Sequence, residues 1–223
     1  MRVRRLVWLG LLAVIVALGM GASKHRIEDR WTNPDIERSE RRKLLVIAIT
    51  EDRQARGIFE DRFVSHLRGK RIECVTSRTM APDLTNIDES QREQIIKTIE
   101  EQDIDGAITV RAVPLKGLGE EEWATAWKQE VRSGGTVRQL VEESLPLSMN
   151  KSKKYGVEVA FWDAKTGKRI WGGRTNPYTP DQMKNGAADF VQFVMYALEL
   201  EDLIKGRDPY PDDPAGFVEQ QQP

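Results

Sequence analysis

Lys43-Leu-Leu-Val-Ile-Ala-Ile-Thr50 is a continuous apolar run between charged neighbours. Its length and its β-branched residues are typical of a strand that is buried on both faces of a sheet. The next segment, 52–69, carries apolar residues at spacings of three and four, which predicts an amphipathic helix with Asp52 as its cap. A buried strand followed by such a helix is the first half of a crossover unit of a parallel sheet.

The same order continues as far as residue 113. Short strands are predicted at 71–77 and 107–113, and a second helix begins between them at Asp88. Connections of this length favour parallel pairing of the strands with right-handed crossovers. The first part of the domain is therefore predicted to have the order β-α-β-α-β.

A hairpin and a long helix complete the predicted domain. The segments 157–162 and 169–171 flank a short loop that ends in glycine and lysine, which is typical of an antiparallel hairpin. A final helix is predicted from Thr179 to about Ile204. We therefore predict a single α/β domain over 43–205, with a mixed (α+β) sheet, helices packed on the sheet and a C-terminal helix.

The two ends of the chain differ in composition from this domain. Residues 1–22 show arginines, then an apolar run, then small residues, which is the layout of a secretory signal peptide. An N-terminal membrane anchor is the alternative, because the apolar run is at the short limit for crossing a bilayer. Residues 23–42 predict a polar tether, and 206–223 predict a disordered tail. We expect an exported domain, either periplasmic or anchored in the inner membrane and facing the periplasm.

The segment 114–153 interrupts the α/β pattern and is interpreted as an excursion from the domain. It is longer than the roughly 12–15 residues beyond which loops in compact domains are uncommon. Trp123 and Trp127 lie four residues apart on a short predicted helix within it. Their rings are predicted to form a partner-binding face, because tryptophan dominates the energetics of many interfaces. The alternative is that both rings pack the excursion onto the domain.

Familiar catalytic and metal-binding patterns are absent from the sequence. Lys and Arg total 34 and Asp and Glu total 35, which excludes the broad basic surface of a nucleic-acid-binding protein. Ser65 and His66 are neighbours on a predicted helix, where adjacent side chains diverge by about 100° and cannot act together. Asp103 and Asp105 are expected in a helix-to-strand turn, and the single cysteine, Cys74, in the core. We expect no catalytic residue, no metal and no cofactor.

Four stretches of the domain carry a family resemblance. They are 43–50, Phe59-Glu-x-x-Phe-x-x-x-Leu67, Asp105-Gly-Ala-Ile-Thr-Val110 and Phe161-Trp-Asp-x-x-Thr-Gly-Lys-x-x-Trp171. Together they resemble uncharacterised bacterial envelope proteins, many of them lipoproteins, with an α/β domain similar to the TolB amino-terminal domain and the periplasmic domain of the curli secretion lipoprotein. The resemblance implies interaction or assembly roles in the envelope and supplies no catalytic residues. The lipid-modified cysteine of such lipoproteins is missing here.

These observations predict a non-enzymatic cell-envelope protein, a periplasmic interaction or assembly factor. Its expected partner is an envelope protein or an envelope polymer and not a nucleic acid, and an oligomer is compatible with the sequence. The alternative is a periplasmic protein that binds or processes a small ligand or carbohydrate with carboxylates near the 114–153 excursion. A pocket in which two carboxylates converge, one with a raised pKa, would favour the alternative.

Overall fold

The fold is seen in a computed structural model. It describes residues 27–35, 41–50, 52–80, 93, 97–99, 101–115, 117–132 and 149–205. The predicted signal peptide or anchor (1–22), most of the helix predicted from Asp88 and the predicted tail (206–223) lie outside these residues.

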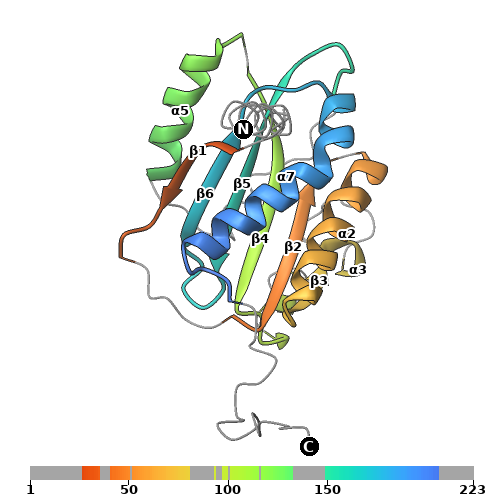
Figure 1. The fold of residues 1–223 in the computed structure, drawn as a ribbon, viewed down its shortest axis with the longest axis vertical. Helices are drawn as coiled ribbons and strands as arrows, with labels where there is room; N and C mark the ends of the chain where they lie inside the picture. Colours follow the sequence, from red (N-terminus) through yellow and green to blue (C-terminus); the bar gives the residue numbers. More distant parts are fainter. Residues whose placement is uncertain are drawn as a thin grey trace, which may run out of the picture.

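The described residues form one mixed sheet of six strands in the order β1-β6-β5-β4-β2-β3 (Figure 1). The strands are β1 (Ile27–Thr32), β2 (Lys43–Ile49), β3 (Glu73–Thr76), β4 (Gly106–Pro114), β5 (Tyr155–Asp163) and β6 (Arg169–Thr175). β2 pairs in parallel with both β3 and β4, as predicted from the crossover spacing. β4, β5, β6 and β1 are successively antiparallel, which confirms the hairpin and the mixed sheet.

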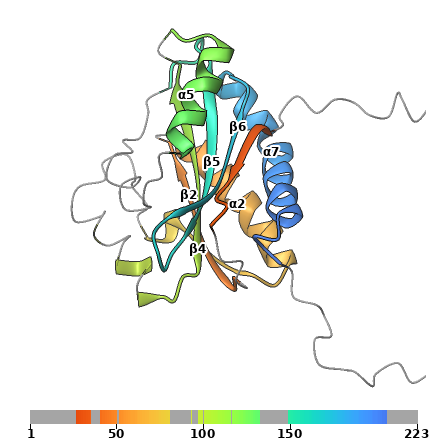
Figure 2. The same ribbon diagram turned by 90° about the vertical axis from the view of Figure 1, so that its left-hand side faces the viewer.

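Two helices, α2 (Arg53–Gly69) and α7 (Pro180–Leu200), cover one face of the sheet (Figure 2). Asp52 caps α2 as predicted, because its carboxylate accepts hydrogen bonds from two backbone N–H groups of the first turn. α7 begins with a capping box of Thr179 and Gln182. The two helices start beside each other, near the C-terminal end of β2, where Lys184 pairs with Asp52.

The main core lies between these helices and the sheet. The rings of Phe59 and Phe190 meet edge to face with their centroids 5.7 Å apart, so they join the middles of α2 and α7. Phe63, Phe161 and Val194 are fully buried in the same cluster. Alternation along β2 directs Val46 to this core and Ile47 to the opposite face, which explains why the whole strand is apolar.

α5 (Glu120–Arg132) covers part of the opposite face, next to β5, β6 and β1 (Figure 2). It confirms the first helical piece of the 114–153 excursion, whereas most of the remainder of that excursion lies outside the described residues. The short helix α3 (Ser77–Met80) follows β3 directly.

The prediction of a tether over 23–42 needs correction. Residues 27–32 are the edge strand β1, which pairs with β6. The charged sequence Glu-Asp-Arg did not predict a strand. Its charges have partners on β6, on α5 and at Glu201 just after α7, all far away in the chain. The domain therefore begins before residue 43, and β1 adds an outer edge to the sheet.

Phe63→Ala is expected to lower the free energy of unfolding by about 3–5 kcal/mol, because the ring is fully buried between α2 and the sheet. Urea denaturation measures this change. Ser65→Ala, at an exposed position of the same helix, is the control and is expected to stay within about 0.5 kcal/mol of the parent. Equal unfolding midpoints for the two variants would contradict this packing of α2.

Candidate functional site

A row of four alternating charges crosses the sheet beneath α5. Arg111 on β4 lies opposite Glu158 on β5, Glu158 lies opposite Arg174 on β6, and Arg174 lies opposite Asp29 on β1. Residues directly opposite each other on antiparallel strands share one face of the sheet. The four side chains therefore form one row across four strands, which we call the charge row.

Glu158 is the buried centre of the charge row, with 2% of its surface exposed. Arg111 Nε donates to Glu158 Oε2 over 2.6 Å, and Arg169 Nη1 lies 3.4 Å from Glu158 Oε1. The guanidinium of Arg169 also stacks on the ring of Trp162, 4.8 Å from its centroid. A buried carboxylate needs such compensation, because an unpaired charge in the interior is strongly destabilising.

α5 adds an ion pair at each end of the charge row. Glu130 pairs with Arg111, and Lys128 Nζ lies 3.1 Å from Asp29 Oδ1. Burial raises the pKa of Asp29, but the hydrogen bonds and charges of Lys128 and Arg174 outweigh burial and hold the pKa below its ordinary value. The α5 partners in both pairs are about half exposed, so these contacts add only a small stabilisation to the packing of α5.

Trp123 and Trp127 fix α5 by close packing, and both rings are buried. A Cβ atom on Gly156 would lie 2.5 Å from the ring of Trp123, so this strand position admits the ring only as glycine. A Cβ atom on Gly172 would likewise lie 2.8 Å from the side chain of Val131 and 3.5 Å from the ring of Trp127. Partner binding through the two rings stays a prediction, and it would require α5 to leave the sheet.

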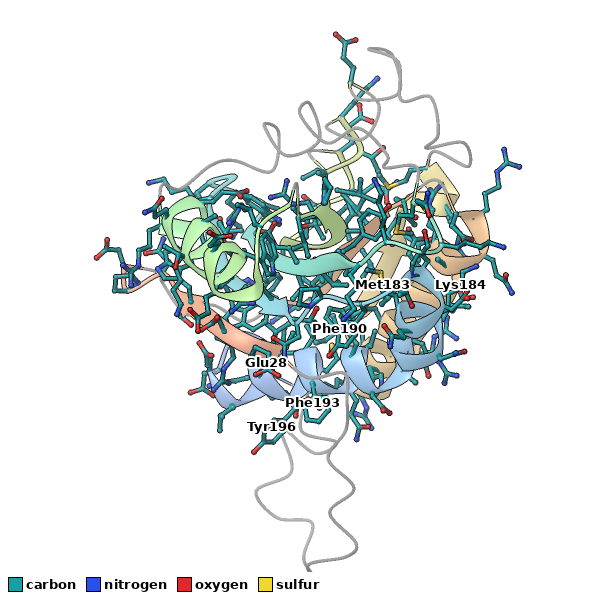
Figure 3. All side chains as sticks on the ribbon, turned by 90° about the horizontal axis from the view of Figure 1, so that it is seen from above. Glu28, Met183, Lys184, Phe190, Phe193 and Tyr196 are labelled. Carbon is teal, nitrogen blue, oxygen red and sulfur yellow. The ribbon has the colours of Figure 1, made fainter. Side chains whose placement is uncertain are left out.

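The exposed surface of the helical layer carries a different feature. Phe193, Tyr196 and Leu200 of α7 expose 36%, 63% and 62% of their surfaces, and we call them the α7 patch. Figure 3 shows Phe193 and Tyr196 on the side of α7 away from the sheet, whereas Phe190 points toward the sheet. Their spacing of three and four residues places the three side chains on one side of the helix, where they form a candidate interaction surface.

A small apolar cavity of about 30 Å³ lies where β2 and β4 end. Phe59, Val110, Met149 and Met183 are among its lining residues. Its volume suits one small aliphatic group, and its apolar lining offers few hydrogen-bond partners to a water molecule. The cavity lies near the ion pair of Lys184 and Asp52. Its lining residues include no carboxylate, so it does not provide the pair of convergent carboxylates that the alternative function needs.

The residues that the sequence analysis considered for catalysis or metal binding do not form a site in the described part of the chain. Ser65 is exposed and His66 half-buried on α2, side by side on the helix. Asp105 Oδ2 accepts hydrogen bonds from the backbone N–H groups of Arg42 and Lys43, at 2.8 and 2.9 Å, so this carboxylate closes the turn into β4 as expected. Cys74 is half-buried rather than fully buried, and burial is the main reason that its thiol pKa is raised to about 12. The thiol is therefore protonated at neutral pH.

The described residues contain no group of three or more His, Cys, Asp or Glu side chains that could hold a metal ion. Among the helices of these residues, none combines the length and the apolar character needed to cross a bilayer.

No family model and no curated protein matches the chain. Among solved structures, a PelC dodecamer from Paraburkholderia phytofirmans has a TM-score of 0.37 and 12% identity, covering 80% of this chain and 97% of that chain. A dodecamer of a PelC variant with one substitution has a TM-score of 0.38 and 12% identity, covering 76% of this chain and 96% of that chain. With TM-scores below 0.5 and 12% identity, neither the fold nor the role of PelC is transferred to this chain.

The charge row and the α7 patch were not foreseen from the sequence. Glu158 and Arg174 interrupt otherwise apolar strands, and a charge inside a buried strand is a usable signal for a partner across the sheet. The pairing itself depends on strand order, which spacing alone does not provide. The α7 patch gave the weaker signal of apolar residues off the buried stripe of a helix.

Replacing Trp123 and Trp127 together by alanine is expected to lower the melting temperature by roughly 10 °C or more, because each ring fills a site that is at least nine-tenths buried. Thermal unfolding followed by circular dichroism measures the change. Gln129→Ala, at an exposed position of α5, is the control and should leave the melting temperature nearly unchanged. An unchanged melting temperature in the double variant would show that the rings do not hold α5.

Asp29→Asn is expected to destabilise the domain at neutral pH, because it removes the carboxylate that pairs with Arg174 and Lys128. The folded pKa of Asp29 is lowered, so the stabilisation is complete above the ordinary value of 3.8 and is lost as the pH falls through the lower folded value. The unfolding midpoints of parent and variant should therefore differ at pH 7 and converge below pH 3.8. A difference that does not depend on pH would contradict the ion pairing.

Proposed function

We propose that this chain is an exported, non-enzymatic protein of the bacterial cell envelope that acts by binding a protein partner in an interaction or assembly role. The observation that carries the proposal is the α7 patch, an apolar surface on the outer side of a helix that is otherwise packed for the core. Burying such area is the main driving force of protein association. The arginine, apolar and small-residue order of residues 2–23 supports export.

The carboxylates near the excursion support binding rather than chemistry. Glu158, Glu130 and Asp29 each contact at least one cationic side chain. A general acid needs a carboxyl group whose pKa is raised toward neutrality, whereas the pKa of Asp29 is lowered. These groups therefore suit a rigid support for α5 better than the alternative function of processing a carbohydrate or another small ligand.

The family resemblance points in the same direction. The TolB-like and curli-lipoprotein-like motifs lie on elements that build the core: the strand at 43–50, the helix around Phe63 and the hairpin from Phe161 to Trp171. Apolar residues of these elements belong to the core of the domain. In the proposal, the domain is a rigid support that presents the outer side of α7 to an envelope protein.

A photocrosslinking amino acid at position 196 tests the proposal in intact cells. We expect an adduct with an envelope protein from position 196 and none from position 129, an exposed site of α5 on the opposite side of the sheet. Adding Leu200→Ser to the position-196 variant should reduce the yield of the adduct, because that change removes part of the apolar patch. Equal adducts from both positions, or none from position 196, would contradict partner binding by α7.

A further inference from the structure

The carboxyl ends of β2 and β4 form a topological switch point of the sheet. The two strands are parallel neighbours, so both end on the same side of the domain. β2 is followed by α2, which covers one face of the sheet, whereas β4 is followed by α5, which covers the opposite face (Figure 2). In open α/β sheets, ligands bind in the crevice outside the carboxyl ends of the strands at such a point.

The apolar cavity of about 30 Å³ lies at this switch point. Residues 48–50 and 110–112, at the ends of the two strands, line it, and Phe59 of α2 and Met183 of α7 add to its walls. The order of the elements and the position of the cavity are independent observations. Both select the same place in the fold as a binding site.

The lining of the cavity favours an apolar occupant. Among the described residues that line it, only Thr50 and Arg111 have polar side chains. Arg111 Nε donates to Glu158 in the charge row on the opposite face, and the Thr50 hydroxyl accepts a hydrogen bond from the Asp52 N–H over 3.2 Å. The atoms around an empty apolar cavity lack dispersion contacts, and an aliphatic group restores these contacts.

Two methionines allow the cavity to adapt to its occupant. Met183 is buried and Met149 is half-buried in the lining. Unbranched thioether side chains fit irregular apolar groups by changing rotamer. Met149, Arg111 and Ala112 are the half-buried residues of the lining, so a ligand enters on their side.

We propose that this cavity binds the compact aliphatic group of a small apolar molecule. The site is separate from the α7 patch, so the inference goes beyond the proposed function and does not depend on it. The aliphatic group would lie between Phe59 and Met183, and the rest of the molecule would extend past Met149 and Ala112 toward solvent. Each further CH₂ group that fits should strengthen binding roughly fourfold.

Methyl NMR spectra of the purified chain, labelled at its methionine methyl groups, test the site with ethanol, n-propanol, isobutanol and glycerol. We expect saturable shifts of the Met149 and Met183 signals with the three aliphatic alcohols, and an affinity that rises from ethanol to isobutanol by roughly fourfold for each CH₂ group. Glycerol should give no saturable shift, because its hydroxyl groups would lose their hydrogen bonds to water. Met80, which packs against the cluster on the opposite face of the sheet, is the internal control.

Ala112→Leu and Ala126→Leu form a matched pair for the test. Leucine at position 112 fills the cavity, so it should weaken isobutanol binding by roughly tenfold or more and leave the melting temperature equal or higher. Ala126 is exposed on α5, away from the cavity, and its variant should bind isobutanol within about twofold of the parent. If Ala112→Leu lowers the melting temperature, Ala55→Val on the α2 side of the cavity replaces it.

Three outcomes would overturn the inference. Shifts that grow linearly with alcohol concentration and do not saturate would show a packing void and not a binding site. Equal isobutanol affinities of Ala112→Leu and Ala126→Leu would place the alcohol elsewhere on the chain. Glycerol that binds as tightly as isobutanol would contradict selection for an aliphatic group. None of these results changes the crosslinking expected from position 196, so failure of this inference is distinguishable from failure of the proposed function.

Discussion

Glu158 is a carboxylate in the middle of a buried strand, and the antiparallel half of the sheet is arranged around it. An unpaired carboxylate at that depth would cost several kcal/mol, so folding must bring Arg111 and Arg169 to it. Because side chains alternate along a strand, slipping β5 by one residue would move the charge into the apolar core beneath α7. The charge row therefore fixes the register of β4, β5 and β6, independently of apolar packing.

The same face of the sheet must also accept a helix at close range. Gly156 and Gly172 leave room for Trp123 and Trp127, and the charges of α5 meet the two ends of the charge row. Apolar packing over these glycines determines where the helix lies, and the two half-exposed ion pairs add a small contribution. This combination explains why Trp123 and Trp127 pack inside the domain, which was the alternative to the predicted partner-binding face.

The local sequence pattern was sufficient to predict the elements whose buried residues and end signals lie within one continuous segment. The strand at 43–49, the helix capped by Asp52 and the hairpin around 163–169 each carry their own periodicity and end signals. β1 could not be predicted in this way, because the charges at 28–30 read as a solvated segment until β6, α5 and α7 supply their partners. The charge row has the same origin: its members lie on four strands, and no spacing along the chain joins them.

Glu201 fixes the end of α7 to the two outer strands of the sheet. Its carboxylate accepts hydrogen bonds from the Thr32 hydroxyl of β1 and from the indole N–H of Trp171 on β6, the latter over 3.2 Å. The end of α7 therefore cannot move relative to the outer two strands without breaking buried or half-buried contacts. A surface that is fixed before binding loses less conformational entropy when a partner docks. The contacts of Glu201 with β1 and β6 therefore also fix the position of the α7 patch, the surface that we propose for the partner.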